Sequence, residues 1–331
     1  MDVPQPGTPQ WHDLVREDVV DPDRVIIDPH HHLWPAGQAL NYDIGDLLAD
    51  VRDGHRIECT VFMECGASYD TDAPAHLAAV GETRFVASRA ASDPHRTIRA
   101  LVGSADLTLA NLDEVLDAHV EASNGMFRGI RDALSRADEP GALTIPGRAA
   151  EGKFENPDFV RGVRRLGERG LTYDSWHYHH QNREFLSLAR SAPGTTMVLD
   201  HFGTPVGVGK WAGRHDEIFA SWRRDIDEIA ACPNVVAKIG GLAMPDNGFG
   251  WHTAERPPTS DEFVTAQGRW YEHAIQAFGP ERCMFESNFP VDRLSLSYRT
   301  YWNAAKKIAA GYTENEKDAM FRGTAARVYS L

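Results

Sequence analysis

Three consecutive histidines close a short apolar segment near the start of the chain, in the motif Asp28-Pro29-His30-His31-His32. Successive side chains of a β-strand point to opposite faces, so His30 and His32 are expected to point the same way. Two imidazoles on one face can share a cation or polarise a substrate oxygen. The motif therefore predicts a functional site at the end of a strand, with a histidine-rich surface turn as the alternative.

Two other polar side chains, His201 and Glu64, also end apolar segments. A single histidine at the end of a strand is more often a satisfied structural side chain, but a second histidine motif makes convergence with His30 and His32 the better interpretation. An unpaired carboxylate at the end of an apolar strand is costly. Glu64 is therefore expected either to form a structural ion pair or to act as a catalytic base.

Candidate substrate-binding residues follow two further segments. Arg128 and Arg131 lie in the motif Arg-Gly-Ile-Arg, and an arginine at a strand end can hold a carboxylate through two hydrogen bonds. Arg131, which comes later in the segment, is the better candidate, and a salt bridge to Asp132 or to an acidic loop residue is the alternative. Tyr178 and His179 belong to a run of aromatic and histidine residues that would supply a wall and an imidazole, or would simply pack.

Eight short apolar segments are predicted as strands, spaced about one βα unit apart. Several are continuous apolar runs, which indicates strands covered on both faces, as in a parallel sheet flanked by helices. Helical periodicity is found at 215–232 and 111–122, and Ser260 is predicted to cap a helix that includes 263–278. The predicted strands are 25–29, 59–65, 100–105, 127–130, 171–176, 196–201, 235–239 and 283–287.

Eight βα units in one chain predict an α/β fold of the (β/α)8 TIM-barrel type. We assign residues 24–331 to a single barrel domain and residues 1–23 to an N-terminal arm. A doubly wound sheet would normally show a glycine-rich turn after the first strand, yet no glycine follows that strand until Gly37. The glycine- and proline-rich segments 138–152, 202–213 and 240–258 are expected to be loops over the active-site end of the barrel.

Charge and composition exclude several classes of protein. The chain has 331 residues with 34 Lys and Arg against 48 Asp and Glu, a net charge of −14, which disfavours binding to nucleic acid or to anionic membranes. No apolar run approaches the roughly 20 residues of a membrane-spanning helix, and the first residues do not form a secretory signal. Four scattered cysteines predict free thiols. We expect a soluble, cytoplasmic protein, as a monomer or homo-oligomer, acting on a small molecule.

The motifs together resemble the amidohydrolase-related superfamily, in the branch of lactonases that act on 2-pyrone-4,6-dicarboxylate and on sugar lactones such as fuconolactone. The resemblance extends from about Arg24 to the end of the chain, and it is specific as a combination although no single motif is. The residues that carry it are Asp28, His30 and His32, the segments 128–131, 173–181 and 200–205, and the strand-eight segment 287–290.

The resemblance implies a (β/α)8 barrel that hydrolyses a lactone or related ester, often one whose substrate is carboxylated and therefore anionic. Some members of this branch work without a metal, and related branches hold zinc between the histidines. The cofactor is accordingly either none or one divalent metal such as zinc. His30, His32 and His201 are the candidate metal ligands.

One position departs from the family pattern. Asn288 stands where the family usually has the aspartate that activates water, and an amide cannot take a proton at neutral pH, although it can orient a water molecule. Either the role of the base moves to Glu64, Glu286, His201 or His179, or the chemistry differs. We predict that the histidines polarise the carbonyl, that Arg131 anchors a substrate carboxylate, and that Asn288 positions the water.

Two other functions remain open at the level of the sequence. A metal-dependent decarboxylase of an aromatic or unsaturated acid would use a similar barrel and histidine set, although that branch also relies on an acidic residue at strand eight. A catalytically silent barrel that binds a ligand is the second alternative, and it is suggested by Asn288.

Overall fold

Eight parallel strands form one sheet in the computed structural model, which describes residues 4–331. The first three residues of the predicted 1–23 arm lie outside the described part. Each strand pairs with the next one in the chain, and a bridge between His31 and Phe289 joins the first and last strands. The strands are β1 (Val25–His31), β2 (Arg56–Met63), β3 (Ile98–Gly103), β4 (Phe127–Ile130), β5 (Thr172–Ser175), β6 (Met197–Leu199), β7 (Val235–Gly240) and β8 (Cys283–Glu286).

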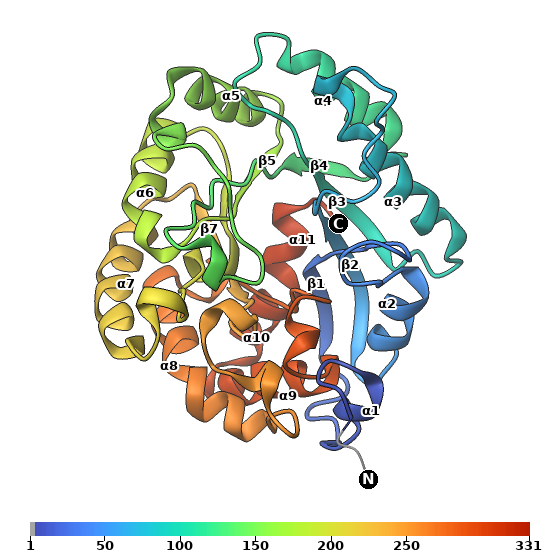
Figure 1. The fold of residues 1–331 in the computed structure, drawn as a ribbon, viewed down its shortest axis with the longest axis vertical. Coiled ribbons are helices and arrows are strands. Elements are labelled where there is room, and N and C mark those ends of the chain that lie inside the picture. The colour runs from blue at the N-terminus through green and yellow to red at the C-terminus, as the bar shows by residue number, and fades with distance from the viewer. Residues whose placement is uncertain (1–3) are drawn as a thin grey trace.

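Helices surround this sheet and confirm the predicted (β/α)8 barrel (Figure 1). Nearly every strand residue is buried, because the strands are covered on one side by helices and on the other by the barrel interior. The helices are α1 (Pro9–His12), α2 (Ile44–Val51), α3 (Val80–Ser92), α4 (Leu112–Ala122), α5 (Pro157–Glu168), α6 (Asn182–Ser191), α7 (His215–Ala230), α8 (Ser260–Phe278), α9 (Tyr298–Ile308), α10 (Glu314–Asp318) and α11 (Thr324–Val328).

The predicted helices at 215–232 and 111–122 are confirmed as α7 and α4, with ends that differ by one or two residues. The predicted cap of α8 was wrong by one position. Thr259, rather than Ser260, has extended backbone angles and accepts a hydrogen bond from the Glu262 amide. The Glu262 side chain in turn accepts a hydrogen bond from the Thr259 amide at 2.8 Å. This reciprocal capping box fixes the start of the helix.

The barrel interior is filled partly by the C-terminal end of the chain. Ala325 and Tyr329 pack against inward-facing strand residues such as Ile27, Val61 and Val198. In the view of Figure 1, α11 appears between the strands, and it contacts β1 and β8. Side chains from the strands and from this segment therefore form a packed core, as in other barrels of this type.

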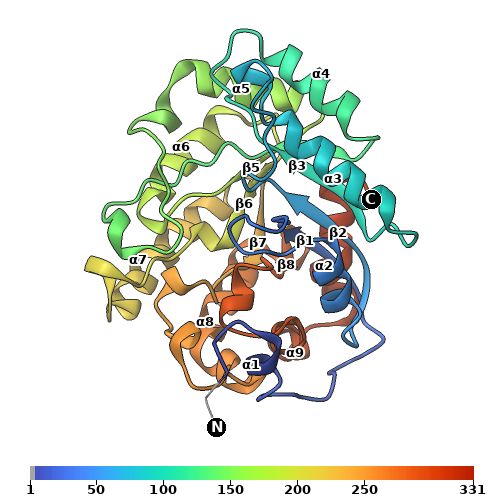
Figure 2. The ribbon, with the colours of Figure 1, turned by 45° about the vertical axis from the view of Figure 1, so that its right-hand side comes forward.

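The described part of the N-terminal arm lies against the barrel. Trp11 is fully buried, and its indole donates a hydrogen bond to the Ala254 carbonyl at 3.1 Å. The His12 ring contacts the Arg293 carbonyl at 2.8 Å. Figure 2 shows α1 beside α9 at the lower end of the molecule. These contacts give the arm a packing role on the barrel surface.

The described chain can be compared with two predictions from composition, on membrane-spanning helices and on the state of the cysteines. None of the helices between residues 4 and 331 combines the length and the apolar character that crossing a bilayer demands. Cys59, Cys65, Cys232 and Cys283 are all unpaired, in agreement with the prediction of free thiols.

The buried side chain of His119 is expected to make the stability of the fold depend on pH. The ring is fully buried on α4, where it contacts the Thr83 hydroxyl at 2.8 Å and the Ser104 carbonyl at 3.0 Å, and burial lowers its pKa from 6.5 to about 4. The unfolded chain binds this proton more readily, so the contribution to stability is complete above about pH 6.5 and is lost as the pH falls towards 4. Between pH 7 and pH 5 the loss is about 2 kcal/mol.

We expect the variant His119→Asn to be less stable at pH 7 but to lose about 2 kcal/mol less than the parent between pH 7 and pH 5. Urea unfolding at both pH values measures this difference. Parallel pH dependence in the two proteins would show that the histidine is not held neutral by its surroundings.

Candidate active site

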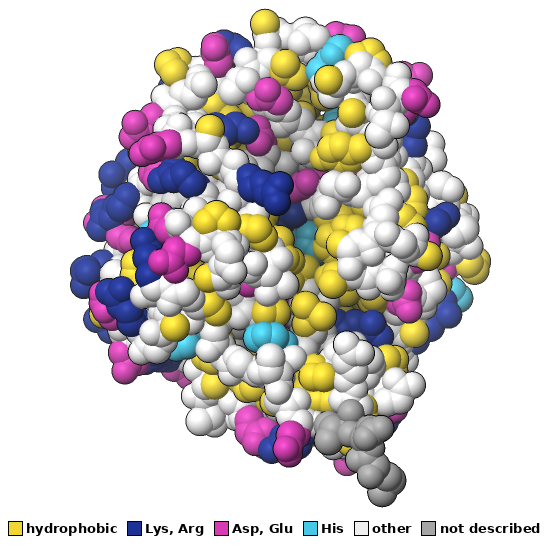
Figure 3. Space-filling model, viewed as in Figure 1, with side chains coloured by type: hydrophobic (Ala, Val, Ile, Leu, Met, Phe, Trp, Pro, Cys, Tyr) yellow, Lys and Arg dark blue, Asp and Glu magenta, His cyan; other side chains and the backbone are white. Residues whose placement is uncertain are grey.

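A cavity of about 260 Å³ lies at the carboxyl ends of the strands. Figure 3 shows a hollow near the middle of this face with basic and histidine side chains inside it. Hydrophobic side chains make up much of the wall, which gives the polar groups a largely apolar setting. The cavity is lined by His32, Trp34, Glu64, Cys65, Gly66, Arg131, Ala133, Ile145, Trp176, His201, Met244, Asn288 and Val291.

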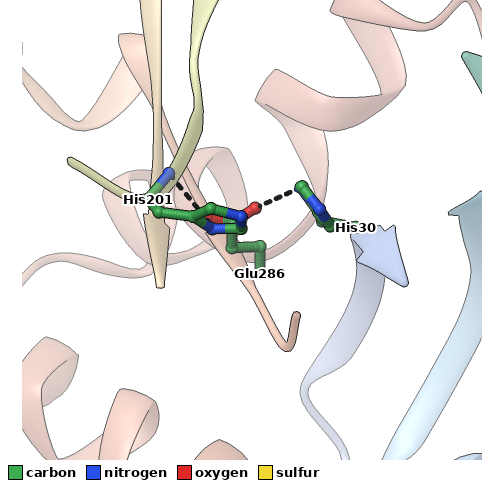
Figure 4. Close-up of side chains that lie close together, drawn as sticks. All are labelled: His30, His201 and Glu286. Atoms are coloured by element: carbon green, nitrogen blue, oxygen red, sulfur yellow. Dashed lines mark hydrogen bonds and ion pairs between the residues drawn. The ribbon is translucent and has the colours of Figure 1, made fainter. Parts of the chain in front are cut away.

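Glu286, at the end of β8, holds two of the predicted histidines (Figure 4). One carboxylate oxygen lies 2.8 Å from Nδ1 of His30, and the other lies 2.7 Å from Nδ1 of His201. The backbone amide of His201 also donates to this carboxylate at 3.1 Å. A carboxylate that accepts from Nδ1–H fixes both the ring orientation and the tautomer. Glu286 therefore orients the His201 ring with Nε2 on the side away from the carboxylate, and it lies in contact with His30.

His32 is fixed in the Nδ1–H tautomer by a backbone carbonyl. Its Nδ1 donates to the Met63 carbonyl at 2.8 Å, and its Nε2 lies 3.2 Å from Nε2 of His30. Burial lowers the pKa of both rings well below the ordinary value, with further lowering by Lys238 for His30 and by Arg131 for His32. The two Nε2 atoms of these neutral rings lie close enough either to share a hydrogen bond or to ligate one cation.

Arg131 connects β4 to the carboxylates around the cavity. Its Nε donates to the Glu64 side chain at 2.7 Å, a terminal nitrogen donates to the Glu64 carbonyl, and another contacts Asp200 at 3.4 Å. Burial raises the pKa of Glu64 even though the Arg131 charge acts in the opposite direction. Glu64 thus lies in an ion pair and also lines the cavity, so both of its predicted roles remain compatible with the geometry.

Lys238 of β7 lies fully buried next to His30. Its ammonium contacts Asp174 at 2.9 Å and Asp200 at 3.1 Å, and it lies 3.3 Å from Nδ1 of His30. Although burial alone would lower the pKa of Lys238, the charges of Asp174 and Asp200 raise it. The Tyr329 hydroxyl donates to Asp174 at 2.5 Å, so the C-terminal segment also supports this network.

Asn288 occupies the cavity wall in a strained conformation. Its φ is 54°, a left-handed value that is uncommon outside glycine, and the His201 φ is 52°. The Asn288 amide donates to Asp292 at 2.9 Å, which leaves its carbonyl oxygen as the acceptor in the wall. Asp292 also accepts from the Ala243 amide at 3.1 Å and does not line the cavity. Asp292 is therefore not placed to take the role of the aspartate that the family usually has at position 288.

Three of the predicted substrate-binding residues lie outside this cavity. The Arg128 guanidinium donates to the Tyr329 carbonyl at 2.6 Å, which ties β4 to the C-terminal segment. The Tyr178 hydroxyl accepts from the Gly147 amide at 2.7 Å and donates to the Ile145 carbonyl at 3.1 Å. His179 accepts from the backbone of the loop that follows His201. Tyr178 and His179 thus hold the loops that form the cavity wall, and Arg128 lies apart from it.

Sequence reasoning missed three residues of the site or assigned them a different role. Glu286 was considered only as a base, whereas it orients two histidines. Lys238 was read as part of an apolar strand, and its charge within that buried segment was the available signal. Trp176 is a cavity wall that was considered only as part of an aromatic run.

Gly241 makes room for the His201 ring. Its φ is 71°, and a Cβ atom at this position would lie 2.3 Å from Nδ1 of His201. We expect Gly241→Ala to displace the ring from Glu286 and to lower kcat/KM by about 10²-fold, the scale of effect that a 1 Å misplacement produces. Gly250→Ala is a matched control, because Gly250 has a φ of 75° and no atom within 4 Å of the added carbon.

Both glycine variants carry the cost of a left-handed residue, so they should lose similar stability in thermal unfolding. Steady-state kinetics then separates the two. Equal activity in Gly241→Ala and Gly250→Ala would mean that the His201 position does not matter for turnover.

The residues around the histidines fit a divalent metal. His30, His201 and Glu286 offer ligand atoms that all lie within 4.8 Å of one another, and the Nε2 of His32 faces that of His30. Neutral imidazole nitrogens suit zinc. The buried charges also leave room for a dication, because carboxylates outnumber cations. The carboxylates are Glu64, Asp174, Asp200 and Glu286, and the cations are Arg131 and Lys238.

Comparison with known proteins agrees with this fold. A family model described as amidohydrolase matches residues 27–331. The uncharacterized protein y4mH of Sinorhizobium fredii is 34% identical over 330 residues, covering 93% of this chain and 99% of that protein. L-fucono-1,5-lactonase of Burkholderia multivorans is 29% identical over 310 residues, covering 92% of this chain and 96% of the lactonase.

A solved structure gives the same result. An amidohydrolase of Burkholderia multivorans with bound zinc has a TM-score of 0.73 and 25% sequence identity, covering 93% of this chain and 100% of that one. The family match covers most of the described barrel, and the lactonase match extends over nearly the full length of both chains. The chain therefore belongs to the amidohydrolase family and is a lactonase-like hydrolase.

Proposed function

We propose that this protein opens the lactone ring of a small, uncharged sugar acid derivative by addition of water. The observation that carries the proposal is the bridge from Glu286 to His30 and His201, which prepares two imidazoles beside a cavity that also contains Glu64. The similarity to L-fucono-1,5-lactonase supports a sugar lactone as the substrate class.

An uncharged substrate is favoured over the carboxylated one expected from the sequence. The sequence predicts that Arg131 anchors a substrate carboxylate. In the structure, however, the Arg131 guanidinium already contacts Glu64 and Asp200. The other charged side chain of the cavity wall is Glu64 itself. A substrate carboxylate would therefore meet a cation that is neutralised and an anion that repels it. Trp34 and Trp176 instead offer flat apolar faces on which a sugar ring can lie.

The residues of the chain can carry out each proton movement of the reaction. Glu64 takes a proton as water forms a bond to the carbonyl carbon, and it returns that proton to the ring oxygen when the ester bond breaks. The Asn288 carbonyl oxygen orients the water. Once Glu64 has taken the proton it no longer balances the Arg131 charge, so Arg131 can stabilise the developing oxyanion. His32 uses its Nδ1–H on the Met63 carbonyl, so its Nε2 presents a lone pair and does not itself donate to the substrate carbonyl. A divalent metal held by His30, His32 and His201 would supply Lewis-acid polarisation when bound.

Hydrolysis is tested with purified protein and a panel of sugar lactones that includes L-fucono-1,5-lactone. We expect acid release well above the spontaneous rate, followed with a pH indicator, and no release of carbon dioxide, which separates hydrolysis from decarboxylation. Failure to accelerate any lactone in the panel would overturn the proposal.

Metal binding is expected to depend on the imidazoles of His30, His32 and His201. We expect the purified protein to contain close to one zinc per chain and His30→Asn or His32→Asn to reduce that content sharply, because each variant removes one nitrogen ligand. Elemental analysis measures this independently of turnover, and a chelator titration then compares metal loss with loss of activity. Wild-type protein that stays metal-free after exposure to zinc would contradict the assignment.

A further inference from the structure

A second hollow adjoins the catalytic cavity. It has a volume of about 650 Å³ and lies between the loop after β3 and the long segment that leads from β4 into α5. Ala133 and Trp176 line both spaces, so the two adjoin at these residues. Nothing in the hydrolysis of a single lactone ring uses this groove.

The charges of the groove are mixed in sign. Arg148 and Glu151 are exposed, and neither forms an ion pair or a side-chain hydrogen bond with any residue from 4 to 331. Lys153 also lines the groove, but its charge is paired with Asp132 at 2.7 Å. A free cation and a free anion together do not select a charged ligand. Arg148 can, however, donate a hydrogen bond to a hydroxyl group, and Glu151 can accept one from it, because a hydroxyl is both a donor and an acceptor.

Size points to a ligand of more than one ring. The catalytic cavity, at about 260 Å³, is smaller than the roughly 300–1,000 Å³ of pockets that enclose drug-sized ligands. It therefore suits one small ring. The groove adds more than twice that volume, with an aromatic wall at Trp176 and polar groups beyond it. An aromatic face combined with polar side chains of both signs suits a polyhydroxylated ring.

We propose that this groove binds a second sugar unit attached to the lactone, so that the preferred substrate is the lactone of a disaccharide acid. This inference rests on the proposed lactone hydrolysis and specifies its substrate class. The ring that reacts occupies the catalytic cavity. The attached sugar passes Trp176 and is bound by Arg148 and Glu151.

The test compares D-glucono-1,5-lactone with its glycosylated counterparts, the 1,5-lactones of cellobionic, maltobionic and melibionic acids. We expect at least one disaccharide lactone to have a kcat/KM about tenfold above that of the monosaccharide, the gain from one or two hydrogen bonds to charged groups. Arg148→Ala and Glu151→Ala should each remove most of this preference. Arg223→Ala, an exposed arginine of α7, is the matched control and should retain it.

The outcomes distinguish the two proposals. If no disaccharide lactone exceeds the monosaccharide, or if Arg148→Ala lowers both values equally, the groove is not a sugar subsite although lactone hydrolysis stands. If neither these lactones nor the wider panel is hydrolysed, the proposed function itself fails. A crystal structure with a bound disaccharide acid would place the second ring directly.

Discussion

Glu286→Gln is expected to lower kcat by about 10³-fold while leaving the fold intact. Glu286 accepts a hydrogen bond from Nδ1 of His201 at 2.7 Å, and its other carboxylate oxygen lies 2.8 Å from Nδ1 of His30. A glutamine side chain can accept from one ring only, because its other terminal atom is an amide nitrogen that donates. The second histidine must then change its tautomer or turn away, and its Nε2 no longer presents a lone pair.

Steady-state kinetics on a hydrolysed lactone measures this loss, and circular dichroism with thermal unfolding checks the fold. Glu286→Asp keeps the charge but shortens the side chain, so we expect it to retain more activity than the amide. Glu184→Gln is a control that removes a half-buried ion pair to Arg136 outside the site and should remain close to wild type. Near-normal turnover in Glu286→Gln would show that the bridge does not set the histidine tautomers.

The fold could be predicted because its signal is local. Each strand of a (β/α)8 barrel is buried on both faces, so it is visible in the sequence as a short apolar run. The rule that active sites lie at the carboxyl ends of barrel strands then places strand-end polar residues together. That rule was sufficient to locate His32, Glu64 and His201 in one cavity, with His30 next to them.

The pairing of buried charges could not be predicted in the same way. Glu64 is 67 residues from Arg131, and Lys238 is 64 residues from Asp174, so their contacts depend on strand register and tilt around the whole barrel. The sequence suggested Arg131 as a free anchor for a substrate because its partners lie on other strands. The same limit explains Glu286, whose role depends on the positions of β1 and β6.

Loop residues set a further limit. Tyr178 and His179 have side chains that suit a binding site, yet both hold neighbouring loops through backbone hydrogen bonds. Their direction is decided by the path of the segment after β5, and no periodic pattern governs such a segment. A strand-end residue has a predictable direction, whereas a loop residue does not.

Glu64→Gln is expected to lower kcat by 10²- to 10⁴-fold, the range for loss of a general acid–base group. The substitution is nearly isosteric, and the amide oxygen can still accept the hydrogen bond that Arg131 Nε donates at 2.7 Å. What is lost is the ability to take a proton from water and return it to the leaving oxygen. The effect should therefore fall mainly on kcat, with KM changed much less.

The same strand offers a matched control in Glu58, at the opposite end of β2. Its carboxylate pairs with Arg99 at 3.2 Å and with Arg322 at 2.7 Å, far along the strand from the cavity. Glu58→Gln thus removes a charge of the same type and also weakens ion pairs, but it should leave kcat near the wild-type value. If Glu64→Gln retained wild-type kcat, the proton would have to move through another group. His32 and His201 would then be the candidate bases of the cavity wall, since the Asn288 amide cannot accept a proton at neutral pH.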